Sequence, residues 1–147
     1  MNIDYNAGIK FLEGYASHFE ALEATELKKL RLMHDKKPEA VANLIPDEQA
    51  LIMKSDILER NRVKIFGAKT LDEIYDTAPG SLKTDYMRLT KRIRNAVKQI
   101  RDLNEVIKLM ATERLKRAKR ANKQLETYDE RGSVSTKYRN NLPDIKV

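Results

Sequence analysis

Hydrophobic residues recur along most of the chain at steps of three and four, which is the spacing of one helix face. The first series begins after Asn2 and Asp4, either of which can cap a helix start, and runs to about His34. Its apolar positions are Tyr5, Ile9, Leu12, Tyr15, Phe19, Leu22, Leu27, Leu30 and Met33. Pro38 then disfavours helix at the residue before it. The pattern therefore predicts a first helix over about residues 4–34.

A second helix is predicted over about residues 38–66. Pro38 suits the first position of a helix, and Pro46 either kinks this helix or starts a new one. Four aliphatic residues follow one another at seven-residue intervals: Leu44, Leu51, Leu58 and Ile65. Gly67 is a natural place for the helix to stop.

A short connecting helix is predicted over about residues 70–77. Thr70 and Glu73 match a capping box, with Thr70 as the cap and Glu73 reaching back to it. Ala78, Pro79 and Gly80 end this helix, so the chain is expected to reverse direction there.

The last and longest helix is predicted over about residues 81–128, with Ser81 as its cap. Strict alternation of steps of four and three joins Leu82, Tyr86, Leu89, Ile93, Ala96, Ile100, Leu103, Ile107 and Met110. After Ile107 the phase slips by consecutive steps of four, which resembles a stutter and locally unwinds a left-handed supercoil. We expect Tyr86, Leu89, Ile93 and Ile100 to pack against the first two helices.

The unequal lengths of these helices have a structural consequence. At 1.5 Å per residue they span roughly 45, 30 to 40 and 70 Å, so about 25 Å of the last helix has no counterpart. The sequence therefore predicts an all-α fold: an elongated antiparallel three-helix bundle or coiled coil with short connecting helices and an overhanging C-terminal helix. We expect residues 1–128 to form a single domain and residues 129–147, where the apolar pattern stops, to form a flexible tail.

Composition agrees with long helices and narrows the chemistry. Charged residues make up 35% of the chain, well above the usual quarter, and there are only 5 Gly and 4 Pro. The absence of Cys excludes disulfides and thiolate metal sites. Neither a secretory signal nor an apolar run of ~18 residues is present, so we expect a cytoplasmic protein without membrane insertion.

No pattern for catalysis or for metal or cofactor binding stands out, so we expect a protein that is not an enzyme. His18 and His34 lie sixteen residues apart with no Cys or paired carboxylate at metal-ligand spacing. We expect both to be exposed or partly packed helix residues. No Gly-rich phosphate loop and no nucleophile motif occurs.

Charge is concentrated in the last predicted helix. Residues 81–128 hold 14 of the 29 Lys and Arg but only 5 of the 22 Asp and Glu, so this segment carries +9 and the rest −2. A dense basic run comprises Arg114, Lys116, Arg117, Lys119, Arg120 and Lys123. It suggests nucleic-acid binding as an alternative, which is disfavoured because no aromatic residue lies within the run to stack on bases.

An apolar stripe runs through the same basic segment and is the candidate contact surface. It consists of Ile107, Met110, Ala111, Leu115, Ala118, Asn122 and Leu125. Small side chains permit close approach of a partner helix, and a polar residue such as Asn122 can set its register. An overhanging amphipathic helix can dock another helix, although homodimerisation or back-folding through this stripe is the alternative.

The order of these elements resembles that of the FlgN family of flagellar export chaperones. The resemblance is carried by an ordered set of local features over about residues 5–132. They are the short amphipathic stretch 38–44, the start Asp47-Glu48-Gln49-Ala50-Leu51, the short helix at 70–77, Leu103-Asn104-Glu105, and the close Thr127-Tyr128-Asp129-Glu130-Arg131-Gly132. The dense basic run near Arg117 is a departure from that pattern.

The resemblance implies a cytoplasmic chaperone of the flagellar type III secretion system. Its cargo would be hook-associated, hook-filament junction proteins, whose C-terminal amphipathic helices must not assemble before export. Delivery would involve the cytoplasmic domain of the export gate, without nucleotide or metal. Tyr128, an aromatic residue at the end of the last predicted helix, is the candidate gate contact; the alternative is that it closes the last turn against Leu125.

Overall fold

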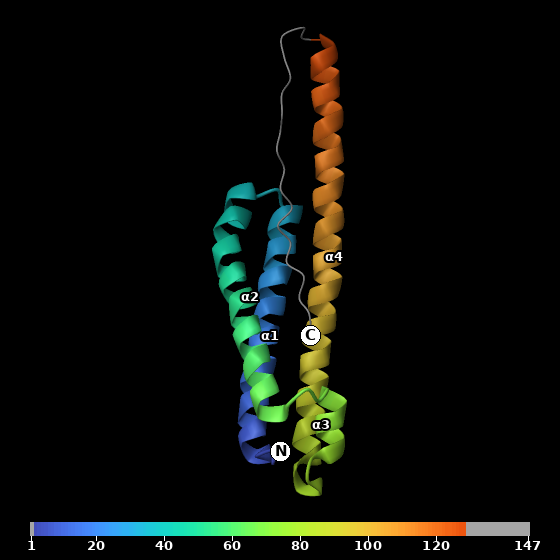
Figure 1. Cartoon of the computed structure of the whole chain (residues 1–147). Coiled ribbons are helices and arrows are strands. Elements are labelled where there is room, and N and C mark those ends of the chain that lie inside the picture. The colour runs from blue at the N-terminus through green and yellow to red at the C-terminus, as the bar shows by residue number, and fades with distance from the viewer. Residues whose placement is uncertain (1, 129–147) are drawn as a thin grey trace.

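The structure, a computed structural model, describes residues 2–128, and every regular element in that range is a helix. The helices are α1 (Tyr5–His34), α2 (Pro38–Phe66), α3 (Leu71–Thr77) and α4 (Lys83–Tyr128), with the 3-10 turn η1 (Gly80–Leu82) before α4. Figure 1 shows α1, α2 and α4 side by side in an elongated bundle, with α3 against the start of α4. The all-α bundle predicted from the sequence is confirmed. The tail expected at 129–147 lies outside the described residues.

The ends of the helices follow the local signals in the sequence. The Asp4 carboxylate accepts hydrogen bonds from the backbone N–H groups of Asn6 and Ala7, both at 3.1 Å, and so caps α1. Thr70 and Glu73 form the expected capping box, with both hydrogen bonds at 3.2 Å. Gly67 ends α2 with a φ of 72°, a conformation that favours glycine.

The backbone shows whether Pro46 starts a new helix and whether Ser81 caps the last one. α2 continues through Pro46, so this proline does not start a new helix. Ser81 does not cap α4, because it lies within the η1 turn and α4 begins at Lys83. The Lys83 side chain joins the start of α4 to α3. Its ammonium group lies 4.8 Å from the centroid of the Tyr75 ring and donates to the Asp76 carbonyl.

α1 is the central helix of the bundle, because it packs against both α2 and α4, whereas α2 and α4 approach each other less closely. α1 and α4 run parallel: the Tyr86 hydroxyl donates to the Tyr5 carbonyl at one end, and Arg114 donates to the Met33 carbonyl near the other. α2 runs antiparallel to α1, since Lys29 pairs with Glu48 near the start of α2. The bundle is therefore up-down-up, with the first and last helices in the longest contact.

The larger of two apolar clusters occupies the half of the bundle nearest α3. Tyr86, Leu89, Ile93 and Ile100 of α4 are all fully buried there, as the sequence pattern predicts. They pack with buried residues of the other helices, namely Leu12, Tyr15, Ala16, Phe19, Leu22, Phe66 and Ile74. A smaller cluster at the far end joins Ile107 and Ala111 to Met33.

The buried face of α4 drifts around the helix, and it does so earlier than the predicted stutter. Ala96 and Val97 are both buried, but beyond them the heptad residue Leu103 is only half-buried while its neighbour Asn104 is buried. An α-helix with 3.6 residues per turn falls behind a seven-residue repeat by about 20° per heptad. The buried positions of α4 are therefore displaced by one residue from the predicted heptad positions at Asn104. This displacement comes before the phase slip that the sequence predicts after Ile107.

Gly8 permits the close approach of α1 to α4 and to the end of α2. A Cβ atom at Gly8 would lie 2.5 Å from the Tyr86 hydroxyl and 2.8 Å from the Phe66 ring. Neither neighbour can move easily, since Phe66 is buried and Tyr86 is held by its bond to the Tyr5 carbonyl. Gly14, in the same helix, faces open space.

This contrast predicts opposite effects of the same substitution at two positions of α1. Gly8→Ala should lower the free energy of unfolding by roughly 1 to 3 kcal/mol, because the methyl group overpacks the helix contact. Gly14→Ala should raise it by about 0.5 to 1 kcal/mol, because alanine is the better helix former. Urea unfolding followed by circular dichroism measures both, and an equal effect of the two changes would contradict the packing described for Gly8.

Candidate helix-docking surface on α4

α4 extends beyond the helices that cover it. α1 ends at His34, close to the point where the Arg114 guanidinium donates to the Met33 carbonyl. In Figure 1, α4 continues well past the ends of α1 and α2. The extension, residues 115–128, is roughly 20 Å long at 1.5 Å per residue. The overhang predicted from the unequal helix lengths is thus present.

The overhang carries an apolar face in line with the buried face of the bundle. Leu115, Ala118, Asn122 and Leu125 follow Ala111 at steps of four and three, so they continue the side of α4 that packs on α1. We call these four residues the distal stripe. Leu125 is 58% exposed, Ala118 is exposed, and Leu115 and Asn122 are half-buried. The distal stripe is the part of the candidate surface that lies beyond α1.

The other residues of the predicted contact stripe belong to the bundle itself. Ile107 and Ala111 are 1% and 5% exposed and pack against Met33, and Met110 packs at the edge of the same cluster. Ile107 and Ala111 are therefore covered by α1, whereas Met110 is half-buried. The reason is the parallel register, because α1 starts level with Tyr86 and is long enough for its last turn to reach Ile107.

Cations occupy most of the circumference of the overhang outside the distal stripe. Lys116, Arg117, Lys119 and Arg120 are exposed and successive residues turn by about 100°, so these side chains point in several directions. Arg114 differs because its guanidinium binds the end of α1. A partner on the distal stripe would therefore have positive charge at its edges. The side chain of Tyr128, the candidate gate contact, lies outside the described residues.

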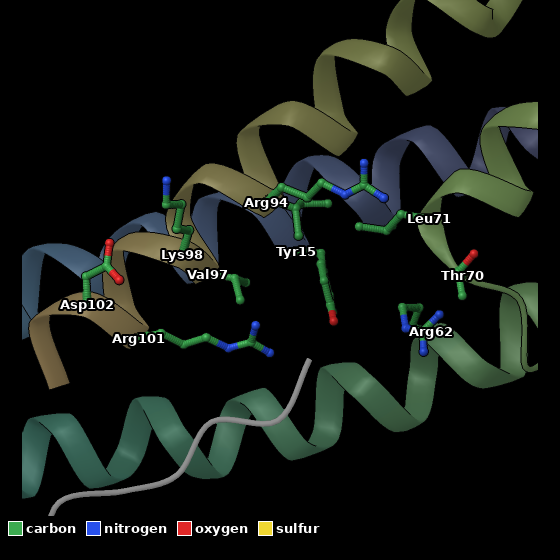
Figure 2. Close-up of a pocket in the computed structure, with 10 residues that line it drawn as sticks. Tyr15, Arg62, Thr70, Leu71, Arg94, Val97, Lys98, Arg101 and Asp102 are labelled. Atoms are coloured by element: carbon green, nitrogen blue, oxygen red, sulfur yellow. The ribbon is translucent and has the colours of Figure 1, made fainter. Parts of the chain in front are cut away.

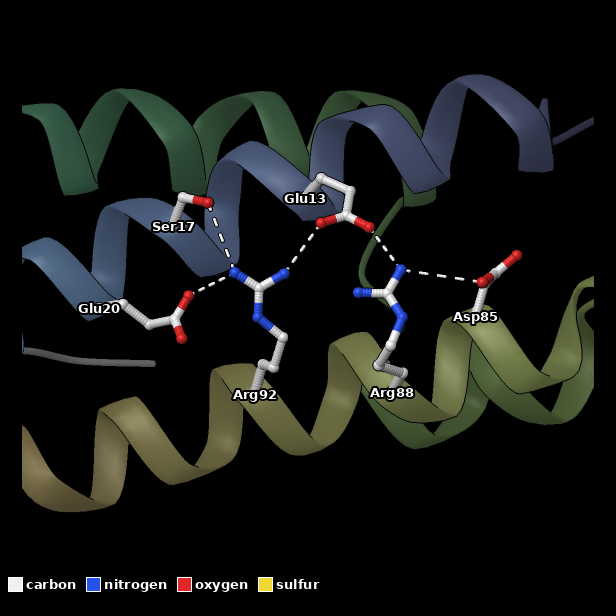
Figure 3. A network of polar contacts seen from close by, with 6 residues as sticks. All are labelled: Glu13, Ser17, Glu20, Asp85, Arg88 and Arg92. Carbon is white, nitrogen blue, oxygen red and sulfur yellow. Dashed lines mark hydrogen bonds and ion pairs between the residues drawn. The ribbon is translucent and has the colours of Figure 1, made fainter.

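Two arginines on α4 fix α1 in the parallel register (Figure 3). Arg92 contacts the Glu13 carboxylate at 2.9 Å and also binds Glu20, and Arg88 binds the same Glu13 carboxylate. The bond from Arg88 is the main cause of the lowered pKa of Glu13. These groups are partly exposed, so each pair adds little stability. Their main effect is geometric, because Glu13 bridges two successive turns of α4.

A polar cluster is buried between α1 and α2, in the half of the bundle nearest the overhang. The Lys29 ammonium lies 3.1 Å from both oxygens of Glu48, and both side chains are almost fully buried. Glu26 is fully buried, and neither of its oxygens accepts a hydrogen bond within residues 2–128. Burial raises the pKa of Glu26 to about 8, the Glu48 carboxylate adds to this rise, and Lys29 opposes it. A protonated Glu26 can donate to Glu48, which explains why its oxygens lack donors.

The raised pKa of Glu26 predicts that stability falls with increasing pH. Folded Glu26 keeps a proton that the unfolded chain releases above its ordinary pKa of 4.5. Its contribution is fully present below pH 4.5 and is lost as the pH rises through about 8. Glu26→Gln keeps the shape and the donor but cannot ionise. We expect this variant to exceed the natural chain in free energy of unfolding by more than ~1 kcal/mol near pH 9, with a smaller difference near pH 6.

Urea unfolding across that pH range measures the effect. Glu105→Gln is the matched control, because Glu105 is an exposed carboxylate on α4. A parallel pH dependence for all three proteins would show that Glu26 titrates normally.

The two histidines lie in different environments. His18 is buried, contrary to the expectation that both histidines would be exposed or partly packed, and its Nε2 lies 2.7 Å from the Ser55 hydroxyl. Burial is the main cause of its lowered pKa. His34 is exposed next to Asp35. Within residues 2–128, no three His, Asp or Glu side chains gather in a way that could hold a metal ion.

Sequence reasoning missed the buried polar cluster, although the pattern contained a signal for it. Glu26 and Lys29 stand between Leu22 and Met33 at helical spacing, on the face that the apolar residues define. Two charged residues on an apolar face require a partner, and Glu48 supplies it from α2. The identity of that partner follows only from the packing of the two helices.

Comparisons with known proteins yield no relative. No protein-family model matches the chain, and no curated protein and no solved structure matches it either. Among the described helices, none combines the length and the apolar character needed to span a bilayer.

Proposed function

We propose that this protein is a helical chaperone that binds an amphipathic helix of a partner protein on the distal stripe. The observation that carries the proposal is the continuation of α4 beyond α1 with an apolar face in line with the core. A helix seated there would extend the bundle. It would cover α4 after Arg114, as α1 covers α4 before Arg114. The exposed Leu125 would then be covered.

The resemblance to the FlgN family supports a specific class of partner. On this proposal the protein is a cytoplasmic type III secretion chaperone that acts by binding and release, without catalysis. It covers the C-terminal amphipathic helix of a hook-associated protein, prevents premature assembly and delivers the cargo to the export gate. An exposed apolar helix face favours aggregation, which a temporary helical partner prevents.

Charged residues placed within the distal stripe test the cargo site. The double variant Leu115→Asp with Leu125→Asp should keep its helicity by circular dichroism and bind the C-terminal segment of a hook-associated protein at least about tenfold more weakly. The matched control is Val106→Asp with Leu109→Asp, since these residues are 44% and 62% exposed on the opposite side of α4. Isothermal titration calorimetry measures the affinities. Unchanged affinity in the stripe variant would place the cargo elsewhere.

The basic run favours one alternative, a nucleic-acid-binding protein. Binding that reads phosphates weakens steeply with added salt, whereas apolar helix docking changes little. A salt titration with cargo and with an oligonucleotide separates the two functions. A third function, a self-associating structural coiled coil, would appear in light scattering as a stable oligomer that needs no other partner.

Contact with the export gate is proposed for Tyr128. The Tyr128→Ala variant should retain cargo but pull down less of the gate's cytoplasmic domain when cargo is bound. A replacement at Thr127, its neighbour in α4, serves as the control. Equal recovery of the gate domain by both variants would remove Tyr128 from this role.

A further inference from the structure

A cleft of about 390 Å³ opens among all four helices, near the end of the bundle that holds α3 (Figure 2). Its apolar lining consists of Leu71 of α3, which is half-buried, and of Tyr15, Ile93 and Val97, which are almost fully buried in the core behind it. The volume lies within the range of ligand-binding pockets. The cleft exists because α1 separates α2 from α4, and α3 bridges only part of the resulting gap.

One wall of the cleft is a row of cations along α4. Arg94, Lys98 and Arg101 lie at steps of four and three, so they share one flank of the helix over roughly 10 Å. Arg94 pairs with Asp72 of α3 at 2.5 Å. Lys98 and Arg101 are exposed, and neither forms an ion pair or hydrogen bond within the part of the chain that the structure describes. Asp102, at the end of the row, is the one carboxylate in the lining.

The opposite wall is held rigidly by Arg62 of α2. Its guanidinium binds both oxygens of Glu59, at 2.6 and 3.0 Å, and donates to the Lys69 carbonyl at 2.7 Å. The Tyr15 hydroxyl donates to the same Glu59 carboxylate at 2.7 Å. These bonds tie this wall to α1 and largely neutralise Arg62. The unneutralised positive charge therefore lies on the α4 wall.

We propose that this cleft binds an acidic, amphipathic peptide segment of a partner protein. An apolar side chain of the segment would cover Leu71, which is half-buried, and carboxylates one or two turns apart would pair with Lys98 and Arg101. The row of cations begins beside Leu71, because Arg94 pairs with Asp72, the next residue of α3, so the exposed lining suits a segment with one apolar and one acidic edge.

The same features disfavour other ligands. A lone phosphate or carboxylate would meet two exposed cations and, among the described lining residues, no buried donor free to bind it, so it would gain little in water. A single-stranded nucleic acid would need an exposed ring for stacking, and Tyr15 is only 1% exposed. The cleft is separate from the distal stripe, which lies further along α4.

A titration with designed peptides tests the proposal on the full chain. The probe is an amphipathic peptide of about four helical turns with leucines along one edge and glutamates beside them. The control peptide carries lysines in place of the glutamates. We expect the acidic peptide alone to shift backbone amide signals of residues lining the cleft in nitrogen-15 NMR spectra, with saturation below about 1 mM.

Matched charge reversals locate the site. Lys98→Glu with Arg101→Glu should weaken the acidic peptide at least about tenfold. Lys10→Glu with Lys64→Glu makes the same change in net charge at exposed lysines outside the cleft, and should weaken it less than about threefold. Neither pair involves a buried side chain, and circular dichroism checks that both variants fold.

In the peptide titration, the inference is wrong if the lysine peptide binds equally well, if the NMR signals shift only in the overhang of α4, or if no signals of the cleft shift at about 1 mM peptide. It is also wrong if both charge-reversal variants weaken peptide binding equally. An oligonucleotide that competes at the cleft more strongly than the peptide would also overturn it. Loss of cargo binding by the Leu115 and Leu125 variant, with peptide binding intact, would leave the two sites independent.

Discussion

The parallel contact between α1 and α4 is the interaction on which the rest of the structure depends. It places two helices side by side that are separated in sequence by α2 and α3, and it begins with the Tyr86 hydroxyl bound to the Tyr5 carbonyl. Gly8 permits this close approach, and Arg88 and Arg92 hold the register through Glu13. Because both helices start at the same end and α4 is longer, the whole excess of α4 extends beyond the other end.

The two ends of the bundle differ in how they are stabilised. Near α3 the core is apolar and includes aromatic pairs, such as Tyr15 with Phe19 at 4.9 Å between ring centroids. Towards the overhang, Glu26, Lys29 and Glu48 replace apolar contacts between α1 and α2. A buried ionic group contributes less net stability than apolar packing of similar volume. The half of the bundle next to the distal stripe is therefore the half with the weaker core.

Both candidate sites arise where α4 is left incompletely covered. At the overhang no helix of the described chain lies beside it, and the exposed surface is an apolar stripe bordered by cations. At the cleft, α1 holds α2 away from α4, which leaves a gap with half-buried Leu71 in its lining and Lys98 and Arg101 on its edge. In both places positive charge stands beside apolar surface, which favours partners that carry apolar and acidic residues together.

The sequence by itself determined the helices, the caps of α1 and α3 and most of the core, because helical periodicity and capping depend on residues up to four positions apart. It also predicted the overhang, since helix length follows from residue number. Only the tertiary structure decided that Ile107 and Ala111 are buried rather than exposed, because their burial depends on how far α1 reaches along α4. The partner of Lys29 and the cleft at Lys98 and Arg101 likewise depend on how separate helices pack. The spacing of residues within one helix does not encode the distance between two helices.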